Sequence, residues 1–243
     1  MLRHKPPTLL AELHSHSTWS DGVLSISELA ELYGRCGFDV LCVTDHTCRS
    51  DDPHGDGGAF GVHAGNFDAY LAELDTAAAL ARERYGLLVV PGLELTYNDP
   101  DPLVAAHALA LGLRRFVSVE DGIERALESA AQAGAALVAA HPYDTGQAGA
   151  AGARLTQRFA HDRTLAPLVH RYELFNRTQL FTWVAEEGLP YVATGDFHVL
   201  EHLSGWKSLV PCAASEEALV TYLRSPRPVF LARLDSPAER LAA

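Results

Sequence analysis

The stretch Glu12-Leu13-His14-Ser15-His16-Ser17-Thr18-Trp19-Ser20-Asp21-Gly22 places two histidines and a carboxylate directly after a short apolar run. Residues 9–13 are typical of a buried strand, and alternate side chains of a strand point to the same face. We therefore expect His14 and His16 to point together, with Asp21 following in a turn rich in serine and glycine. Taken alone, a His-x-His pair is more often a pair of surface or hydrogen-bonded histidines than a pair of metal ligands. The stretch needs partners from elsewhere in the chain to form a site.

Composition narrows the class of protein. A chain of 243 residues that is 48% hydrophobic can bury a full core, which favours a single domain over residues 1–243. No apolar run approaches the roughly 20 residues of a membrane span, and no signal-peptide pattern opens the sequence, so we expect a cytoplasmic protein without membrane contact. The four cysteines lack CxxC spacing and do not indicate a disulfide scaffold. A net charge of −12 argues against binding to duplex nucleic acid, and no pattern indicates an oligomeric state.

Apolar runs of strand length alternate with amphipathic segments along the chain. We expect strands over 9–13, 39–46, 87–96, 104–113, 135–142, 172–176, 190–198 and 228–233, and helices over 25–37, 67–86, 118–134, 179–187 and 215–223. We expect residues 47–66 to form a long loop and residues 143–166 to form either a second long loop or a helical insertion. Strands that alternate with helices predict a parallel sheet, either open or closed into a barrel.

Candidate metal ligands fall mainly at the carboxyl ends of these expected strands. They are six histidines and three carboxylates: His14, His16, His46, His107, His141, His198, Asp21, Glu94 and Asp196. In α/β barrels and open α/β sheets, ligands bind at this edge. Sites of mixed imidazole and carboxylate ligands suit Zn, Mn or Fe, and the residues do not separate these three. The pattern therefore predicts a centre of divalent metal ions.

The same residues stand in ordered motifs that resemble the polymerase and histidinol phosphatase (PHP) superfamily. The motifs are His14-Ser-His16 with Ser20-Asp21-Gly22, Thr44-Asp45-His46, Gly92-Leu-Glu94, His141-Pro142 and Gly195-Asp196-Phe-His198. They extend the resemblance over nearly the whole chain. It implies an α/β fold in the form of a distorted (β/α)7 barrel, with two or three divalent metal ions at the C-terminal ends of the strands.

Residue by residue, the resemblance implies three metal positions. His14, His16, Glu94 and Asp196 would hold the first, Glu94 would bridge to a second held by His107 and His141, and Asp21, His46 and His198 would hold the third. His107 lacks a distinctive flanking motif. Metal ions about 3.5–4 Å apart can clamp the attacking and leaving oxygens of an in-line displacement, with a bridging hydroxide as nucleophile. The expected catalytic residues are then Asp21, His46, Glu94, Asp196 and His198.

The resulting functional prediction is metal-dependent hydrolysis of a phosphate ester. The substrate would be a small phosphorylated metabolite, a nucleotide or nucleoside bisphosphate, or the 5′ end of a short oligonucleotide, because the segment 143–166 resembles an insertion in family members that act on such compounds. Basic side chains near the strand ends are the expected phosphate contacts. They are Arg49, Arg154, Arg158, Arg177 and Lys207.

Three alternatives stay open at this point. The same scaffold carries histidinol-phosphate and phosphotyrosine phosphatases. A metal-dependent amide or lactone hydrolase is a second possibility, disfavoured because no lysine stands where a carbamylated bridge would be expected. A catalytically silent PHP-like module is a third, although none of the nine expected ligand positions is replaced.

Overall fold

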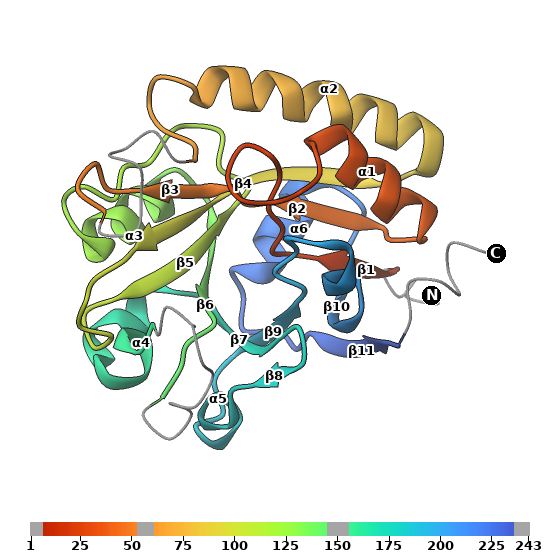
Figure 1. Ribbon diagram of the computed structural model, residues 1–243. Coiled ribbons are helices and arrows are strands. Elements are labelled where there is room, and N and C mark those ends of the chain that lie inside the picture. Colours follow the sequence, from red (N-terminus) through yellow and green to blue (C-terminus); the bar gives the residue numbers. More distant parts are fainter. Residues whose placement is uncertain (1–6, 53–60, 145–155, 236–243) are drawn as a thin grey trace.

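A curled mixed sheet carries the candidate ligands (Figure 1), in a computed structural model that describes residues 7–52, 61–144 and 156–235. Over these residues the strand order is β11-β10-β1-β2-β4-β5-β6-β7-β8, with β3 paired to β4 and β9 paired to β7. The strands are β1 (Thr8–Glu12), β2 (Val40–Val43), β3 (His46–Cys48), β4 (Leu88–Tyr97), β5 (Ala106–Leu111), β6 (Ala136–Ala140), β7 (Arg171–Asn176), β8 (Gln179–Leu180), β9 (Tyr191–Thr194), β10 (Gly205–Pro211) and β11 (Phe230–Leu234).

The predicted α/β class is confirmed, whereas regular alternation of strand and helix is not. Strands β1, β2 and β4 are parallel, but β5 runs antiparallel to both of its neighbours and follows β4 without an intervening helix. Strand β10 is likewise antiparallel to β1 and β11. The curled sheet is compatible with a distorted barrel, without establishing seven β/α units.

Side-chain and loop contacts join strand β9 to β10 and the segment after β9 to the segment after β1. Strands β9 and β10 are linked through the Ser208 hydroxyl, which accepts from the Ala193 amide at 3.0 Å and donates to the Ala193 carbonyl at 2.8 Å. Beyond the ends of β1 and β9, Ser15 and Phe197 form a parallel bridge, and the His16 amide donates to the Phe197 carbonyl at 2.9 Å. The segments 14–16 and 196–198 therefore lie side by side, although they are far apart in sequence.

Helices form in all five of the segments where they were expected, with shifted ends, but the segment 179–187 begins with strand β8 and becomes helical only at Thr182. They are α1 (Ile26–Arg35), α2 (Phe67–Tyr85), α3 (Ile123–Gln132), α4 (Arg158–His161), α5 (Thr182–Glu186) and α6 (Glu216–Leu223), with 3-10 turns η2 (Arg163–Leu168) and η3 (Leu200–Leu203). Ser25 and Glu28 form a capping box that starts α1. The helix expected from Ser118 begins only at Ile123, because the Ser118 hydroxyl accepts from the Glu120 amide in the preceding turn.

Two apolar layers hold the sheet. One face packs on α1, α2 and α3, and alternate strand residues on the other face enclose a second cluster that includes α6. In β2, for example, Leu41 and Val43 belong to the first cluster, whereas Val40 and Cys42 belong to the second. Among the described helices, none is long and apolar enough to cross a membrane.

Candidate metal centre

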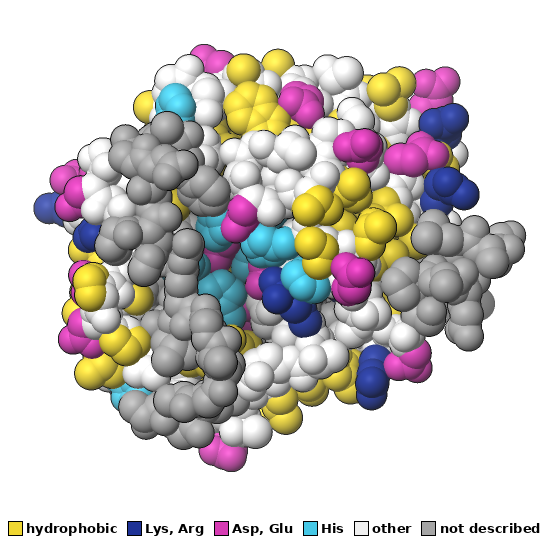
Figure 2. Space-filling view, in the orientation of Figure 1, with side chains coloured by type: hydrophobic (Ala, Val, Ile, Leu, Met, Phe, Trp, Pro, Cys, Tyr) yellow, Lys and Arg dark blue, Asp and Glu magenta, His cyan; other side chains and the backbone are white. Residues whose placement is uncertain are grey.

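The nine predicted ligands converge in the structure. Three overlapping groups have ligand atoms within 4.8 Å of one another: His14, His16 and Glu94; Glu94, His107 and His141; and His16, Asp21, His46 and His198. Asp196 joins them through contacts with His14, His16 and His198. Figure 2 shows histidine side chains gathered in a hollow together with acidic and basic side chains. This grouping resembles the three positions that the motifs imply, with His16 facing two of them.

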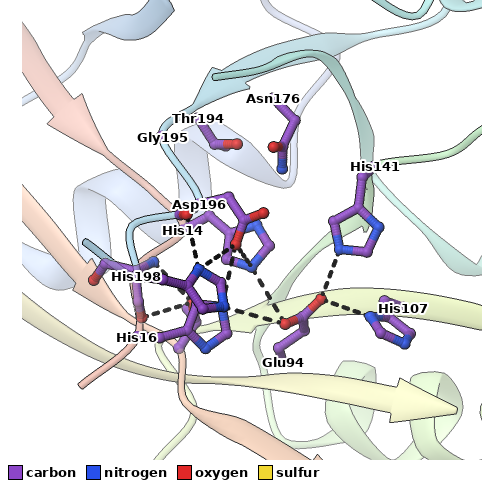
Figure 3. Close-up of polar contacts among 12 residues, drawn as sticks. His14, His16, Glu94, His107, His141, Asn176, Thr194, Gly195, Asp196 and His198 are labelled. Carbon is purple, nitrogen blue, oxygen red and sulfur yellow. Dashed lines mark hydrogen bonds and ion pairs between the residues drawn. The ribbon is translucent and has the colours of Figure 1, made fainter. Parts of the chain in front are cut away.

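The first group has the spacing of a metal site (Figure 3). Glu94 Oε2 lies 3.3 Å from His14 Nε2 and 3.4 Å from His16 Nε2, and Asp196 Oδ1 lies 3.5 and 3.4 Å from the same nitrogens. Two ligand atoms that each bind one ion at about 2.1 Å are about 3.4 Å apart in a tetrahedral arrangement. Within the described residues, His14 Nε2, His16 Nε2 and Glu94 Oε2 are buried without a hydrogen-bond partner. These atoms therefore fit a divalent cation.

The other carboxylate oxygen of Glu94 contacts the histidines of the second group. Its Oε1 lies 3.0 Å from His107 Nδ1 and 3.1 Å from His141 Nε2. The antiparallel strand β5 brings His107 opposite Thr96, two residues along β4 from Glu94, so His107 and Glu94 point to the same face of the sheet. The unexpected direction of β5 thus explains how a histidine without a flanking motif reaches the centre.

Asp21 organises the third group at the opening. Its Oδ1 lies 3.3 Å from His198 Nε2 and 3.5 Å from His46 Nε2. Asp21 is exposed, whereas His46 is buried. The neighbouring Asp45 is fully buried and accepts from the Ser17 amide at 2.8 Å and from the Ser20 hydroxyl at 2.6 Å. This carboxylate therefore holds the turn that presents Asp21.

The electrostatics of the centre keep some of its imidazoles neutral and hold protons on others. Burial opposes protonation of His14, His46 and His198, but the neighbouring carboxylates outweigh it, raising the pKa of His46 to about 10 and raising the pKa values of His14 and His198 as well. Burial, followed by the field of His46, lowers the pKa of His16 to about 3, and burial lowers the pKa of His107 to about 4. Burial opposes ionisation of Glu94 and Asp196, but the neighbouring histidines outweigh it and hold both pKa values well below their usual range. Metal binding requires neutral imidazoles and ionised carboxylates.

One supporting residue was not predicted from the sequence. Glu173 of β7 is fully buried, and its Oε1 lies 2.8 Å from His14 Nδ1 and accepts from Thr194 Oγ1 at 2.6 Å. Its Oε2 accepts from the His141 amide at 2.6 Å and from Asn176 Nδ2 at 2.9 Å. A carboxylate bonded to the far nitrogen of a ligand histidine orients the ring. The available signal was a charged residue inside the apolar run 172–176.

The centre opens into a pocket of about 320 Å³. Its described lining comprises Asp21, His46, Glu94, His107, His141, Tyr143, Asn176, Arg177, Asp196 and His198. Arg177 is the one lysine or arginine in that described lining, and its guanidinium donates to Asp196 Oδ2 at 3.0 Å. The pocket therefore combines the candidate ligands with one guanidinium.

The other predicted phosphate contacts lie elsewhere. Arg158 bonds Glu124 and Asp162, and Lys207 is buried against Glu12, so neither is free to meet a substrate. The Arg49 guanidinium lies over the Tyr97 ring, donates to a backbone carbonyl and is outside the described pocket lining. Arg154 lies outside the residues that the structure describes. Each of these three described cations pairs with a carboxylate of the protein itself, Arg49 with Asp51 at 3.0 Å.

No family model matches the chain, but individual proteins do. The DNA polymerase/3′-5′ exonuclease PolX of Bacillus subtilis is 27% identical over 218 residues, which are 83% of this chain and 36% of that protein. The chain thus spans about a third of this curated relative.

Solved structures share the fold. A two-domain protein of Bacteroides vulgatus containing a predicted PHP-like metal-dependent phosphoesterase matches with a TM-score of 0.64 and 19% identity, over 94% of this chain and 65% of that one. A candidate metal-dependent phosphoesterase of Bifidobacterium adolescentis matches with a TM-score of 0.52 and 16% identity, over 80% of this chain and 90% of that one. An amidohydrolase of Chromobacterium violaceum with bound sulfate matches with a TM-score of 0.52 and 19% identity, over 77% of this chain and 87% of that one. The predicted resemblance is confirmed: the chain has the fold of PHP-like metal-dependent phosphoesterases.

Proposed function

We propose that this protein is a metal-dependent phosphoesterase. The observation that carries the proposal is a set of three buried ligand atoms without hydrogen-bond partners among the described residues: His14 Nε2, His16 Nε2 and Glu94 Oε2. Of these residues, Glu94 lines the same pocket as Arg177. Divalent ions held by the nine candidate ligands would supply a nucleophile at neutral pH and neutralise charge on the transferring phosphoryl group. Mn, Zn and Fe all suit these ligands.

The chain's own residues would bind and orient the phosphate. Arg177 donates through Nε and Nη2 to Asp196, which holds the guanidinium at the edge of the centre, and its remaining N–H groups would donate to phosphate oxygens. Asn176 and Tyr143 line the same pocket and offer further polar groups. Phosphoryl transfer depends mainly on such positioning and on charge neutralisation.

The size of the pocket favours a small substrate. A volume of about 320 Å³ accommodates a terminal phosphate with part of its alcohol. We therefore favour a small phosphorylated metabolite, a nucleotide or nucleoside bisphosphate, or the 5′ end of a short oligonucleotide.

The test is a turnover assay with defined metal content. Purified protein is stripped with chelator, reloaded separately with Mn²⁺, Zn²⁺ or Fe²⁺, and offered phosphate esters that include nucleoside bisphosphates, histidinol phosphate, phosphotyrosine and 5′-phosphorylated oligonucleotides. We expect phosphate release that depends on the metal and is lost in the Asp196→Ala variant. Failure of every loaded form to release phosphate from any ester would refute the proposal, and failure to bind metal would favour a silent module.

A second candidate function is hydrolysis of an amide or lactone. One observation favours it: a solved structure with this fold is named an amidohydrolase. The same loaded protein should be offered amides and lactones at matched concentrations. Turnover of these compounds without release of phosphate from esters would reverse the ranking.

A further inference from the structure

A buried ion pair lies beneath the segments that carry the ligands. Glu12, the last residue of β1, and Lys207 of β10 are both fully buried, and Lys207 Nζ lies 2.7 Å from Glu12 Oε2. The pocket lining includes neither residue. Lysine and glutamate are rarely buried so completely, because removing a charge from water is unfavourable. The pair therefore calls for a role other than contact with substrate.

The Glu12 carboxylate binds the backbone of both ligand segments. Its Oε1 accepts from the His14 amide at 3.2 Å and from the Leu13 amide at 3.0 Å. The same oxygen accepts from the Gly195 amide at 2.7 Å. One carboxylate oxygen thus ties the residue that carries one ligand imidazole to the residue immediately before Asp196.

The turn at Gly195 is built against this pair. A Cβ on Gly195 would lie 2.0 Å from Lys207 Nζ and 2.2 Å from Glu12 Oε2, so a side chain is excluded unless the pair moves. The next residue, Asp196, has a φ of 45° in the left-handed region. Lys207 Nζ also donates to the His202 carbonyl at 3.2 Å, which ties down the segment after His198.

We propose that Glu12 and Lys207 are positioning residues that set the separation of His14 and Asp196, and with it the metal affinity of the centre. The inference rests on the proposed function, because it assumes that the His14 and Asp196 side chains hold a metal ion. Without the pair, the two segments move independently and a metal ion must order them on binding, which weakens affinity. Residues that support ligands from outside the first coordination sphere typically contribute about 10- to 100-fold to metal affinity.

The test compares Lys207→Met with a matched control on the same strand. Ser208→Ala also removes a link between β10 and the edge of β9, but it touches neither ligand segment. We expect Lys207→Met to weaken Mn²⁺ binding by about 10- to 100-fold in competition with an indicator chelator, and Ser208→Ala to change it less than about threefold. In metal-free protein, hydrogen exchange of the peptide that contains Gly195 should accelerate in Lys207→Met alone.

A second variant covers the case in which Lys207→Met does not fold. Removing one partner of a buried ion pair leaves an unpaired charge, whereas replacing both partners with neutral groups of similar size is often tolerated. Glu12→Gln/Lys207→Met should therefore fold, and should still bind Mn²⁺ at least about tenfold more weakly than the wild type.

Wild-type affinity and exchange in either folded variant would overturn the inference, as would equal losses in Ser208→Ala. If the wild-type protein itself binds no Mn²⁺, Zn²⁺ or Fe²⁺, the proposed function fails instead. The two failures are therefore distinguishable.

Discussion

Replacing Glu94 by glutamine should empty two metal groups and spare the third. The Glu94 carboxylate contacts five imidazoles: its Oε2 lies 3.3, 3.4 and 3.0 Å from nitrogens of His14, His16 and His46, and its Oε1 lies 3.0 and 3.1 Å from those of His107 and His141. Two of the three ligand groups contain Glu94, and the group around Asp21 does not. If each group holds one ion, Glu94→Gln loses two ions per chain, whereas Asp21→Asn loses one. Glutamine keeps the size of the side chain, so packing is preserved and the lost charge is isolated.

The assay is elemental analysis of protein that has been stripped, reloaded and desalted, followed by phosphate release from the best ester of the panel. Loss of a group that stabilises transition-state charge costs about 10²- to 10³-fold in rate, or about 2.7–4 kcal/mol, and Glu94→Gln should lose at least that much. Asp21→Asn is the matched control, because it also neutralises one carboxylate of the centre. Wild-type metal content in Glu94→Gln, or a larger loss of metal in Asp21→Asn than in Glu94→Gln, would refute the assignment of Glu94 as the shared ligand.

Three further predictions concern stability and substrate binding. Chelation should lower the midpoint of thermal unfolding by about 5–11 °C. Metal at 100 times its Kd stabilises the folded protein by about 2.7 kcal/mol, and 1 kcal/mol corresponds to about 2–4 °C at this chain length. An unchanged midpoint after verified metal removal would contradict this. Arg177→Ala should raise the KM for phosphate esters about tenfold, or about 1.4 kcal/mol, through loss of a charged hydrogen bond, while Arg158→Ala leaves KM unchanged; equal KM values in steady-state kinetics would exclude Arg177 as a phosphate contact. Arg171 is buried and donates to five backbone carbonyls, four of them in the last turn of α6 or the residues just after it. Arg171→Met should therefore lower the free energy of unfolding in urea by at least about 3 kcal/mol, and a loss below about 1 kcal/mol would argue against this.

The local pattern of the chain predicted most elements but not how β5 pairs. The run 104–113 is apolar throughout, and such a run fits a buried strand of either direction. Its direction depends on how the chain turns between Tyr97 and Ala106, where no helix intervenes. Strand direction is a property of pairing partners, so it could not be read from the apolar run alone.

The candidate ligands were easier to predict than the substrate contacts. Histidines and carboxylates that follow strands converge because the strands share an edge, so their spacing in sequence carries the geometry. For a basic residue, the sequence does not show whether its partner is a substrate or a carboxylate of the protein. Arg158 meets Glu124, and Lys207 meets Glu12 from another strand. Among the predicted basic contacts that the structure describes, Arg177 alone combines a place near a strand end with an opening to the pocket.

Three buried glutamates near the centre differ in whether their oxygens already have donors. The carboxylates of Glu12 and Glu173 each accept hydrogen bonds from backbone amides and from side-chain donors. The hydrogen-bonding capacity of their oxygens is therefore met by the protein itself. Glu94 Oε2 accepts no hydrogen bond from the described residues; it lies 3.0 Å from His46 Nδ1 and faces the Nε2 atoms of His14 and His16. Because Glu173 lies against His14 Nδ1, the proton of a neutral imidazole belongs on that nitrogen and the lone pair lies on Nε2. Against the effect of burial, the carboxylates around His14 raise its pKa, so a cation between Nε2 and Glu94 Oε2, which are 3.3 Å apart, would take the place of a proton held there. This separates the ligand glutamate from the two supporting ones.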